Sequence, residues 1–263
     1  FESEQGDWLK TRAPVLGIAH ADPRTRDLAE TLSGFSAATS SFMIGGLASS
    51  RGAMPQICET VTEGGMSGVL FEPAIGVAVG LSQGCAPIGA THTVTKALDD
   101  VIMEIDERPA LDVFKEDIGE LLAHDLRRVG GYIFAGFPIE GSDTADYLVR
   151  SLTGIDTGRG WIQVGEAVES GRRVLFCRRD HDSALIDLRR MVQDVMKRAG
   201  GTPKAALYYS CIARGRNLFG TDSQELKLVQ EELGEVPLTG FFANGEIFND
   251  RLYGYTGVLA VFS

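Results

Sequence analysis

The sequence predicts an α+β fold, in which mixed and partly antiparallel sheets carry helices on their outer faces and two halves pack closely together. The main observation is an alternation, along the whole chain, between apolar runs of strand length and longer amphipathic segments. A second observation is that some neighbouring runs are separated by turn-like segments typical of hairpins, whereas others are separated by a predicted helix. Hairpins combined with helix-linked strands favour mixed sheets over a purely parallel sheet.

Short apolar runs predict the strands. These runs lie at residues 15–19, 42–44, 66–71, 75–81, 101–105, 132–137, 161–164, 174–177, 205–210, 238–242 and 258–262. Because only the polar segment 166–171 separates 161–164 from 174–177, we expect these two runs to form an antiparallel pair joined by a longer turn. Glycine is abundant, with 32 of 263 residues, and lies mostly within apolar stretches, which indicates tight turns and close backbone approaches.

The first half of the chain predicts one helix at 26–32, and a second helix begins after Pro109. Proline suits the first position of a helix because it lacks the backbone N–H that would have no partner there. The apolar residues that follow recur at helical spacing, at Leu111, Phe114, Ile118, Leu121 and Leu122. This helix marks the predicted boundary between a domain of residues 1–108 and a domain of residues 109–263.

Two further helices are predicted in the second half, within 182–200 and 222–234. Asp182 or Ser183 can cap the first of them, and a Gly-Gly pair ends it. The second begins with an aspartate that has Glu225 three residues later, the spacing of a capping box.

Composition excludes several classes of function. The formal net charge of −11 argues against nucleic acid or an anionic membrane surface as the main partner. The apolar run 74–81 is too short to span a bilayer, so membrane insertion is not expected. The four cysteines lack C-x-x-C spacing and the histidines are scattered, which predicts a reducing, cytoplasmic location with no metal site and no cofactor.

The segment 215–221 has the glycine spacing of a phosphate loop, but Thr221 replaces the required lysine, which excludes nucleotide hydrolysis.

A first candidate site segment follows the predicted strand 205–210. The strand ends in Cys211, and Arg214 and Arg216 flank Gly215 shortly after it. A nearby guanidinium can lower the pKa of a thiol and make it a nucleophile, whereas a free cysteine at a strand end is more often a small buried residue. An arginine beside a glycine can bind a carboxylate through two hydrogen bonds, or it can form an internal ion pair.

A second candidate segment follows the predicted strand 238–242. Phe242 ends this strand and should face a pocket or the core, while Asn244 and Gly245 suit a turn. Glu246 comes directly after the turn and is the predicted partner either of a ligand ammonium group or of Arg214. Both segments leave a strand through glycine, so we expect Cys211, Arg214 and Glu246 to approach one cleft.

These segments, in this order, resemble the C-terminal half of the FIST family. The matching residues are Ser210-Cys211-x-x-Arg214-Gly215-Arg216, Gly240-Phe241-Phe242-x-Asn244-Gly245-Glu246-Ile247 and Leu252-Tyr253-x-x-Thr256-x-x-Leu259. The N-terminal half resembles the FIST N-terminal domain at 42–52, where two glycines precede Ser49 and Ser50, and again at 76–81 and 89–95. The resemblance therefore covers nearly the whole chain.

The resemblance implies a sensory domain of a signal-transduction system that binds a small ligand, an amino acid or another small carboxylate. The ligand-binding residues would be Cys211, Arg214, Gly215, Arg216, Phe242, Asn244, Gly245 and Glu246, and a signalling partner protein would receive the output. One alternative is an enzyme with Cys211 as nucleophile, which is less favoured because no histidine lies near it in sequence. The other is a protein-interaction scaffold without a small ligand, since FIST regions also occur beside F-box segments.

Overall fold

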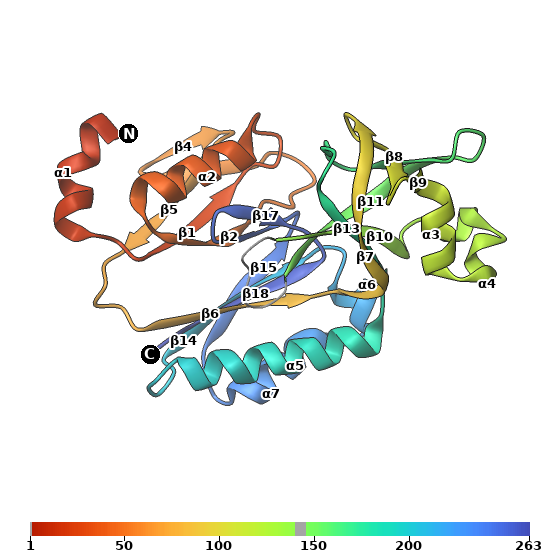
Figure 1. Ribbon diagram of the computed structural model, residues 1–263. Helices are drawn as coiled ribbons and strands as arrows, with labels where there is room; N and C mark the ends of the chain where they lie inside the picture. The colour runs from red at the N-terminus through yellow and green to blue at the C-terminus, as the bar shows by residue number, and fades with distance from the viewer. Residues whose placement is uncertain (1, 140–145) are drawn as a thin grey trace. The chain divides into compact units, whose positions relative to one another are not determined.

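The computed structural model describes residues 2–139 and 146–263, and these form two compact units (Figure 1). The first unit combines Phe1–Gly84 with His181–Ser263, and the second holds Cys85–Asp180. Helices and mixed sheets are both present, so the predicted α+β class is confirmed. Of the helices in the described residues, none is both long enough and apolar enough to cross a membrane.

The first unit contains a five-stranded sheet with the helix α2 on one face (Figure 1). Its strands, in spatial order, are β17 (Arg251–Tyr253), β16 (Glu246–Phe248), β2 (Phe42–Leu47), β1 (Leu16–Ala21) and β5 (Met66–Phe71). β1 and β2 are parallel and the other neighbours are antiparallel. Helix α2 (Leu28–Thr39) buries Leu28 and Leu32 against Ala19 and Met43 of the sheet. The chain also forms α1 (Glu2–Arg12) and a hairpin of β3 (Pro55–Cys58) and β4 (Thr60–Glu63).

A four-stranded sheet forms the other half of the first unit. Its spatial order is β15 (Leu238–Ala243), β14 (Ala205–Cys211), β18 (Thr256–Phe262) and β6 (Val77–Gln83). Two long helices, α5 (His181–Arg198) and α7 (Gln224–Leu233), pack on it, and a short helix, α6 (Gly215–Phe219), follows β14. α5 packs very closely on β6, and the glycine at position 80 allows this. A Cβ atom at Gly80 would stand only 2.5 Å from a methyl group of Val195.

The two sheets of this unit face each other, which gives a layered order of helix, sheet, sheet and helices. His20 of the five-stranded sheet contacts the rings of Tyr209 and Phe241 of the four-stranded sheet edge-on. Its Nε2 lies 3.2 Å from the Tyr209 hydroxyl. The chain passes from one sheet to the other between β15 and β16, at Asn244 and Gly245. The second candidate segment is therefore the crossing point between the layers.

The second unit is an antiparallel six-stranded barrel. Its strands are β7 (Cys85–Leu98), β8 (Val101–Ile105), β10 (Ile133–Pro138), β11 (Tyr147–Asp156), β12 (Trp161–Val164) and β13 (Arg173–Arg179). The pairing of β12 with β8 closes the barrel, and β9 (Arg108–Pro109) adds a short pair to β8. The helical segments are α3 (Ala110–Ile118), α4 (Glu120–Ala123) and the 3₁₀ turn η1 (Leu126–Arg128). Phe114 of α3 packs on Phe176 of β13, with ring centroids 4.8 Å apart.

Two sequence expectations for this region are wrong. The runs 161–164 and 174–177 are not paired with each other, because β12 lies between β11 and β8 while β13 lies between β10 and β7. The connection between them does not fold the two strands into a hairpin, since its Val168 N–H binds the Asp99 carbonyl and its Gly171 N–H binds the Val94 carbonyl. The helix predicted after Pro109 is also interrupted, at Gly119, where φ is +77°. The other predicted strands and helices are present, most of them with shifted ends.

The domain boundary predicted between residues 108 and 109 stays a prediction. The compact units are divided at other positions, after Gly84 and after Asp180. The two compact units are defined by how the folded chain packs. The predicted boundary separates two segments of sequence that resemble two different domains.

We predict that His92 makes the barrel more stable at mildly acidic pH. Its Nδ1 lies 2.6 Å from Asp106 and its Nε2 lies 3.0 Å from Asp117, so the ring ties β7 to the β8–β9 turn and to α3. Burial lowers the pKa of His92, but the two carboxylates outweigh it and the pKa rises above its ordinary 6.5. A raised pKa gives stability that is complete below about 6.5 and is lost as the pH rises through the folded-state value. NMR titration of the His92 ring should show this raised pKa, and a value at or below 6.5 would contradict the two-carboxylate contact.

Candidate functional site

Arg214 lies inside the first unit and forms a buried ion pair. The residue follows β14, directly before α6, and is 1% exposed. Its Nε donates to Oε1 of Glu225 at 2.7 Å. The other guanidinium nitrogens donate to the Ser82 carbonyl at 3.2 Å, to the Ser82 hydroxyl at 3.3 Å and to the Tyr208 hydroxyl at 3.4 Å. The side chain therefore joins β6, β14 and α7.

Glu225 is equally buried and accepts hydrogen bonds from several groups. The Tyr208 hydroxyl donates at 2.7 Å, the Ser210 hydroxyl lies 3.0 Å from both carboxylate oxygens, and the Gly215 N–H donates at 2.9 Å. A buried carboxylate is tolerated only when it is paired and hydrogen-bonded in this way. The capping-box role expected for Glu225 is wrong, because its carboxylate turns inward to Arg214 and no side chain caps the first turn of α7.

A second buried polar cluster joins Cys211, Glu246 and Thr256. Glu246 is 0% exposed, and its Oε2 accepts from the Thr256 hydroxyl at 2.7 Å and from the Thr256 N–H at 3.2 Å. The Cys211 thiol lies against the same carboxyl group. Burial raises the pKa of Glu246 to about 8 and, together with the charge of Glu246, raises the pKa of Cys211 to about 12. Both groups are therefore mainly uncharged at neutral pH.

The structure thus brings Cys211, Arg214 and Glu246 into one region, but this region is the interior of the unit. The internal ion pair considered for Arg214 exists, with Glu225 as its partner in place of Glu246. The cysteine resembles the small buried residue of the alternative interpretation, because a thiol with a pKa near 12 forms little thiolate at neutral pH.

The other candidate residues lie around this interior. Gly215 is buried with φ +46°, and a Cβ atom there would stand 2.6 Å from the Phe242 ring, so only glycine fits without movement. Arg216 and Asn244 are exposed. Gly245, with φ +127°, accepts from the Leu47 N–H and so holds the crossing between the sheets.

A pocket of about 310 Å³ lies beside Phe242, which is 43% exposed. Its remaining lining residues come from β14, β15 and α7 and are Tyr208, Ser210, Leu226, Leu238, Thr239, Gly240 and Phe241. The hydroxyl groups of Tyr208 and Ser210 both donate to Glu225. The pocket therefore combines apolar walls with polar groups that belong to the ion-pair network.

The sequence interpretation missed Glu225, Tyr208 and Ser82 as members of this site. One signal for Glu225 was present, because the buried face of α7 consists of Glu225, Leu228, Val229 and Leu233. These residues follow helical spacing, so a glutamate on the apolar stripe indicated a buried partner of opposite charge. No local signal identified Ser82, which lies 132 residues from Arg214 in the sequence.

A second pocket, of about 380 Å³, lies at the carboxyl ends of the parallel strands β1 and β2. His20, Ser49, Ser50, Gln56 and Ser67 line it. Ser49 and Ser50 belong to the N-terminal segment with FIST resemblance, so this segment, like the C-terminal ones, contributes to a cavity. Burial lowers the pKa of His20, which keeps its ring neutral near pH 7.

We predict that Cys211 reacts slowly with iodoacetamide in the native protein. Its raised pKa leaves little thiolate, whereas Cys58 is exposed. Mass spectrometry of the protein after brief labelling at neutral pH should show modification at Cys58 well before Cys211. Faster labelling of Cys211 would show that its thiolate is stabilised and would restore the nucleophile hypothesis.

We also predict that Glu246 makes stability depend on pH. Its folded-state pKa, about 8, lies above the ordinary 4.5, so its stabilising contribution is complete below about 4.5 and is lost as the pH rises through 8. The variant Glu246→Gln cannot lose this proton. Urea unfolding at about pH 5 and about pH 9 should therefore show the wild type losing stability relative to Glu246→Gln at the higher pH. A difference between the two proteins that is the same at both pH values would contradict the buried, neutral carboxyl.

Comparison with known proteins assigns the chain to a family. The FIST N domain matches residues 2–108, and the FIST C domain matches residues 110–249. An uncharacterized protein of Mycobacterium tuberculosis is 36% identical over 213 residues, which are 77% of this chain and 55% of that protein. An uncharacterized protein of Mycobacterium bovis is 34% identical over 210 residues, 77% of this chain and 54% of that protein. The chain thus spans about half the length of these relatives. Together the two domain matches cover nearly all of the sequence, and the chain belongs to the FIST family, whose domains are associated with sensing in signal transduction.

Proposed function

We propose that this chain is the ligand-sensing part of a signal-transduction protein and that its small ligand binds in the pocket beside Phe242. The observation that carries the proposal is the composition of this pocket. Its walls include Leu226, Leu238 and the half-exposed Phe242, while the hydroxyl groups of Tyr208 and Ser210 belong to a buried ion-pair network. Binding sites for small molecules typically combine mainly apolar walls with a few fixed polar groups, in volumes from about 300 Å³ upward.

The proposed ligand is an amino acid with an apolar side chain, or another small carboxylate with an apolar body. Its apolar part would pack on Phe242 and Leu226, and the ammonium group of an amino acid would donate to the hydroxyl oxygens of Ser210 and Tyr208, whose own protons are given to Glu225. The pairing of Glu225 with Arg214 neutralises the charge below these hydroxyls, so an anionic group meets no net negative charge there.

Direct binding of the carboxylate to Arg214 is less favourable than the sequence suggested. The guanidinium is buried and already bonded to Glu225, Ser82 and Tyr208. Separating a buried ion pair costs about 3–5 kcal/mol because it leaves a charge without a partner. In this proposal Arg214, Gly215 and Glu246 are therefore buried residues that support the fold around the site and do not touch the ligand. Phe242 is the candidate residue that contacts the ligand.

The proposal includes a signalling partner protein that receives the output and a cytoplasmic location. All four cysteines are free thiols, which suits a reducing compartment. No observation favours the nucleophilic enzyme, because Cys211 is buried and the pKa of its thiol is raised.

A thermal-shift screen against amino acids, small organic acids and nucleotides tests the proposal. A ligand present at 100 times its Kd adds about 2.7 kcal/mol to the free energy of unfolding, which raises the Tm by several degrees. We expect the shift to come from an amino acid or organic acid, and to be lost in Leu226→Glu and Phe242→Ser.

The matched control is Ile212→Ser, which replaces a half-exposed apolar residue just after β14 that does not line the pocket. This variant should keep the shift. If no compound raises the Tm, the small-ligand function is wrong. If Leu226→Glu and Phe242→Ser keep the full shift, the ligand binds elsewhere.

A further inference from the structure

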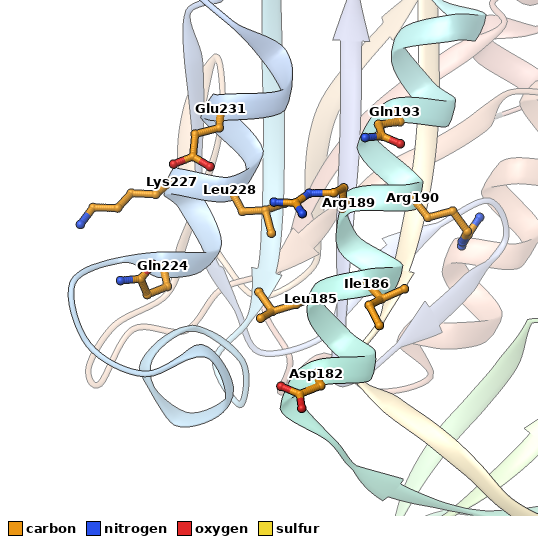
Figure 2. A pocket seen from close by; sticks show the side chains of 10 residues that line it. All are labelled: Asp182, Leu185, Ile186, Arg189, Arg190, Gln193, Gln224, Lys227, Leu228 and Glu231. Carbon is orange, nitrogen blue, oxygen red and sulfur yellow. The ribbon is translucent and has the colours of Figure 1, made fainter.

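The outer face of the first unit carries a groove between α5 and α7 (Figure 2). Leu185, Arg189 and Gln193 extend from α5 toward α7, while Lys227 and Leu228 belong to the opposite wall. The groove has a volume of about 670 Å³. Arg189 and Glu232 connect the two helices at 2.8 Å, and Gln193 binds the same glutamate at 3.0 Å, so the walls are held at a fixed separation.

One ridge of α5 beside this groove has an unusual pattern. Asp182, Ile186 and Arg190 are each four residues apart, so they lie on one line along the helix surface. Ile186 is 72% exposed, although a helix that covers a sheet normally presents polar groups outward. An exposed apolar residue therefore lies midway between an acid and a base.

This pattern is complementary to itself. Suppose that the α5 helix of a second copy lies antiparallel to the first, with the two-fold axis passing through Ile186. Each residue then faces the residue of the second copy that lies equally far from Ile186 in the opposite direction along the helix. Asp182 then faces Arg190 of the second copy, Arg190 faces Asp182, and the two isoleucines meet at the centre. A two-fold interface must match one surface to itself in this way.

The groove adds apolar surface beside this central contact. Its lining contains the apolar residues Leu185, Ile186 and Leu228 among the charged and amide groups. Both signs of charge are present, with Arg189, Arg190 and Lys227 opposing Asp182 and Glu231. A partner of one charge would be repelled by part of this surface, whereas a second copy brings the opposite sign to Asp182 and to Arg190.

We propose that the protein forms a symmetric dimer through α5, with Ile186 at the two-fold axis and Asp182 paired with Arg190 of the second copy. Arg190 also binds Asp187 within its own helix at 2.7 Å, and its side chain remains largely exposed to a partner. This proposal is independent of the ligand pocket beside Phe242, because Asp182, Ile186 and Arg190 all belong to α5 and none of them lines that pocket.

Sedimentation velocity over a range of concentrations tests the dimer. The wild type should change from the mass of one chain, 28.3 kDa, to twice that mass as concentration rises. Ile186→Asp should remain monomeric, because it places two carboxylates at the axis. The matched control Leu121→Asp replaces an apolar residue of the barrel unit that is 80% exposed, and it should dimerise like the wild type.

A charge reversal then tests the pairing itself. Asp182→Arg and Arg190→Asp should each raise the dimer Kd at least about tenfold, since each creates two like-charge contacts. The double variant Asp182→Arg with Arg190→Asp recreates both pairs with exchanged signs and should return the Kd to within about threefold of the wild type.

Thermal melting of each variant checks that the fold is kept, which is expected for exposed positions. A wild type that stays monomeric at every concentration would overturn the proposal. A double variant as weakly associated as the single variants would also overturn it, because the Asp182–Arg190 pairing would then be absent.

Discussion

The buried pair of Arg214 and Glu225 is the constraint on which the candidate site depends. A guanidinium and a carboxylate taken out of water must satisfy each other, because each alone would cost several kcal/mol to bury. Here the pair also fixes the chain around it. Glu225 holds the first turn of α7 against β14 through Ser210 and Tyr208, and Arg214 reaches β6 through Ser82. The elements that line the pocket are therefore positioned by one ionic contact.

The glycines of the two motif segments have separate physical reasons. Gly215 gives its N–H to Glu225 at a positive φ and lies under the Phe242 ring, where a side chain would collide. Gly245 makes the crossing from the four-stranded to the five-stranded sheet, after which Glu246 enters the interior. These residues serve the architecture of the site, and Phe242 remains at its surface. A ligand whose charged ends were held by Arg214 and Glu246 would require both side chains to leave their present partners.

Much of the fold could be predicted from local patterns. The runs 66–71, 101–105 and 161–164 match the observed strands, because apolar residues bounded by turns determine strand positions locally. Pairing was not local, which is why 161–164 and 174–177 were wrongly paired: closure of the barrel joins β12 to β8. The site shows the same limit. The glycines in the sequence indicated where both motif segments lie. The acidic partner of Arg214 could not be identified from the sequence, because only the folded structure brings Glu225 of α7 against β14.

A double-mutant cycle on Arg214→Met and Glu225→Leu measures this central contact most directly. If the two side chains form a buried ion pair, each single variant should lose about 3–5 kcal/mol in the free energy of unfolding. The double variant should then lose at least about 2 kcal/mol less than the sum of the two single losses, because no charge is left without a partner. Losses that add within about 0.5 kcal/mol would show that the side chains do not interact, and would contradict a site organised around this ion pair.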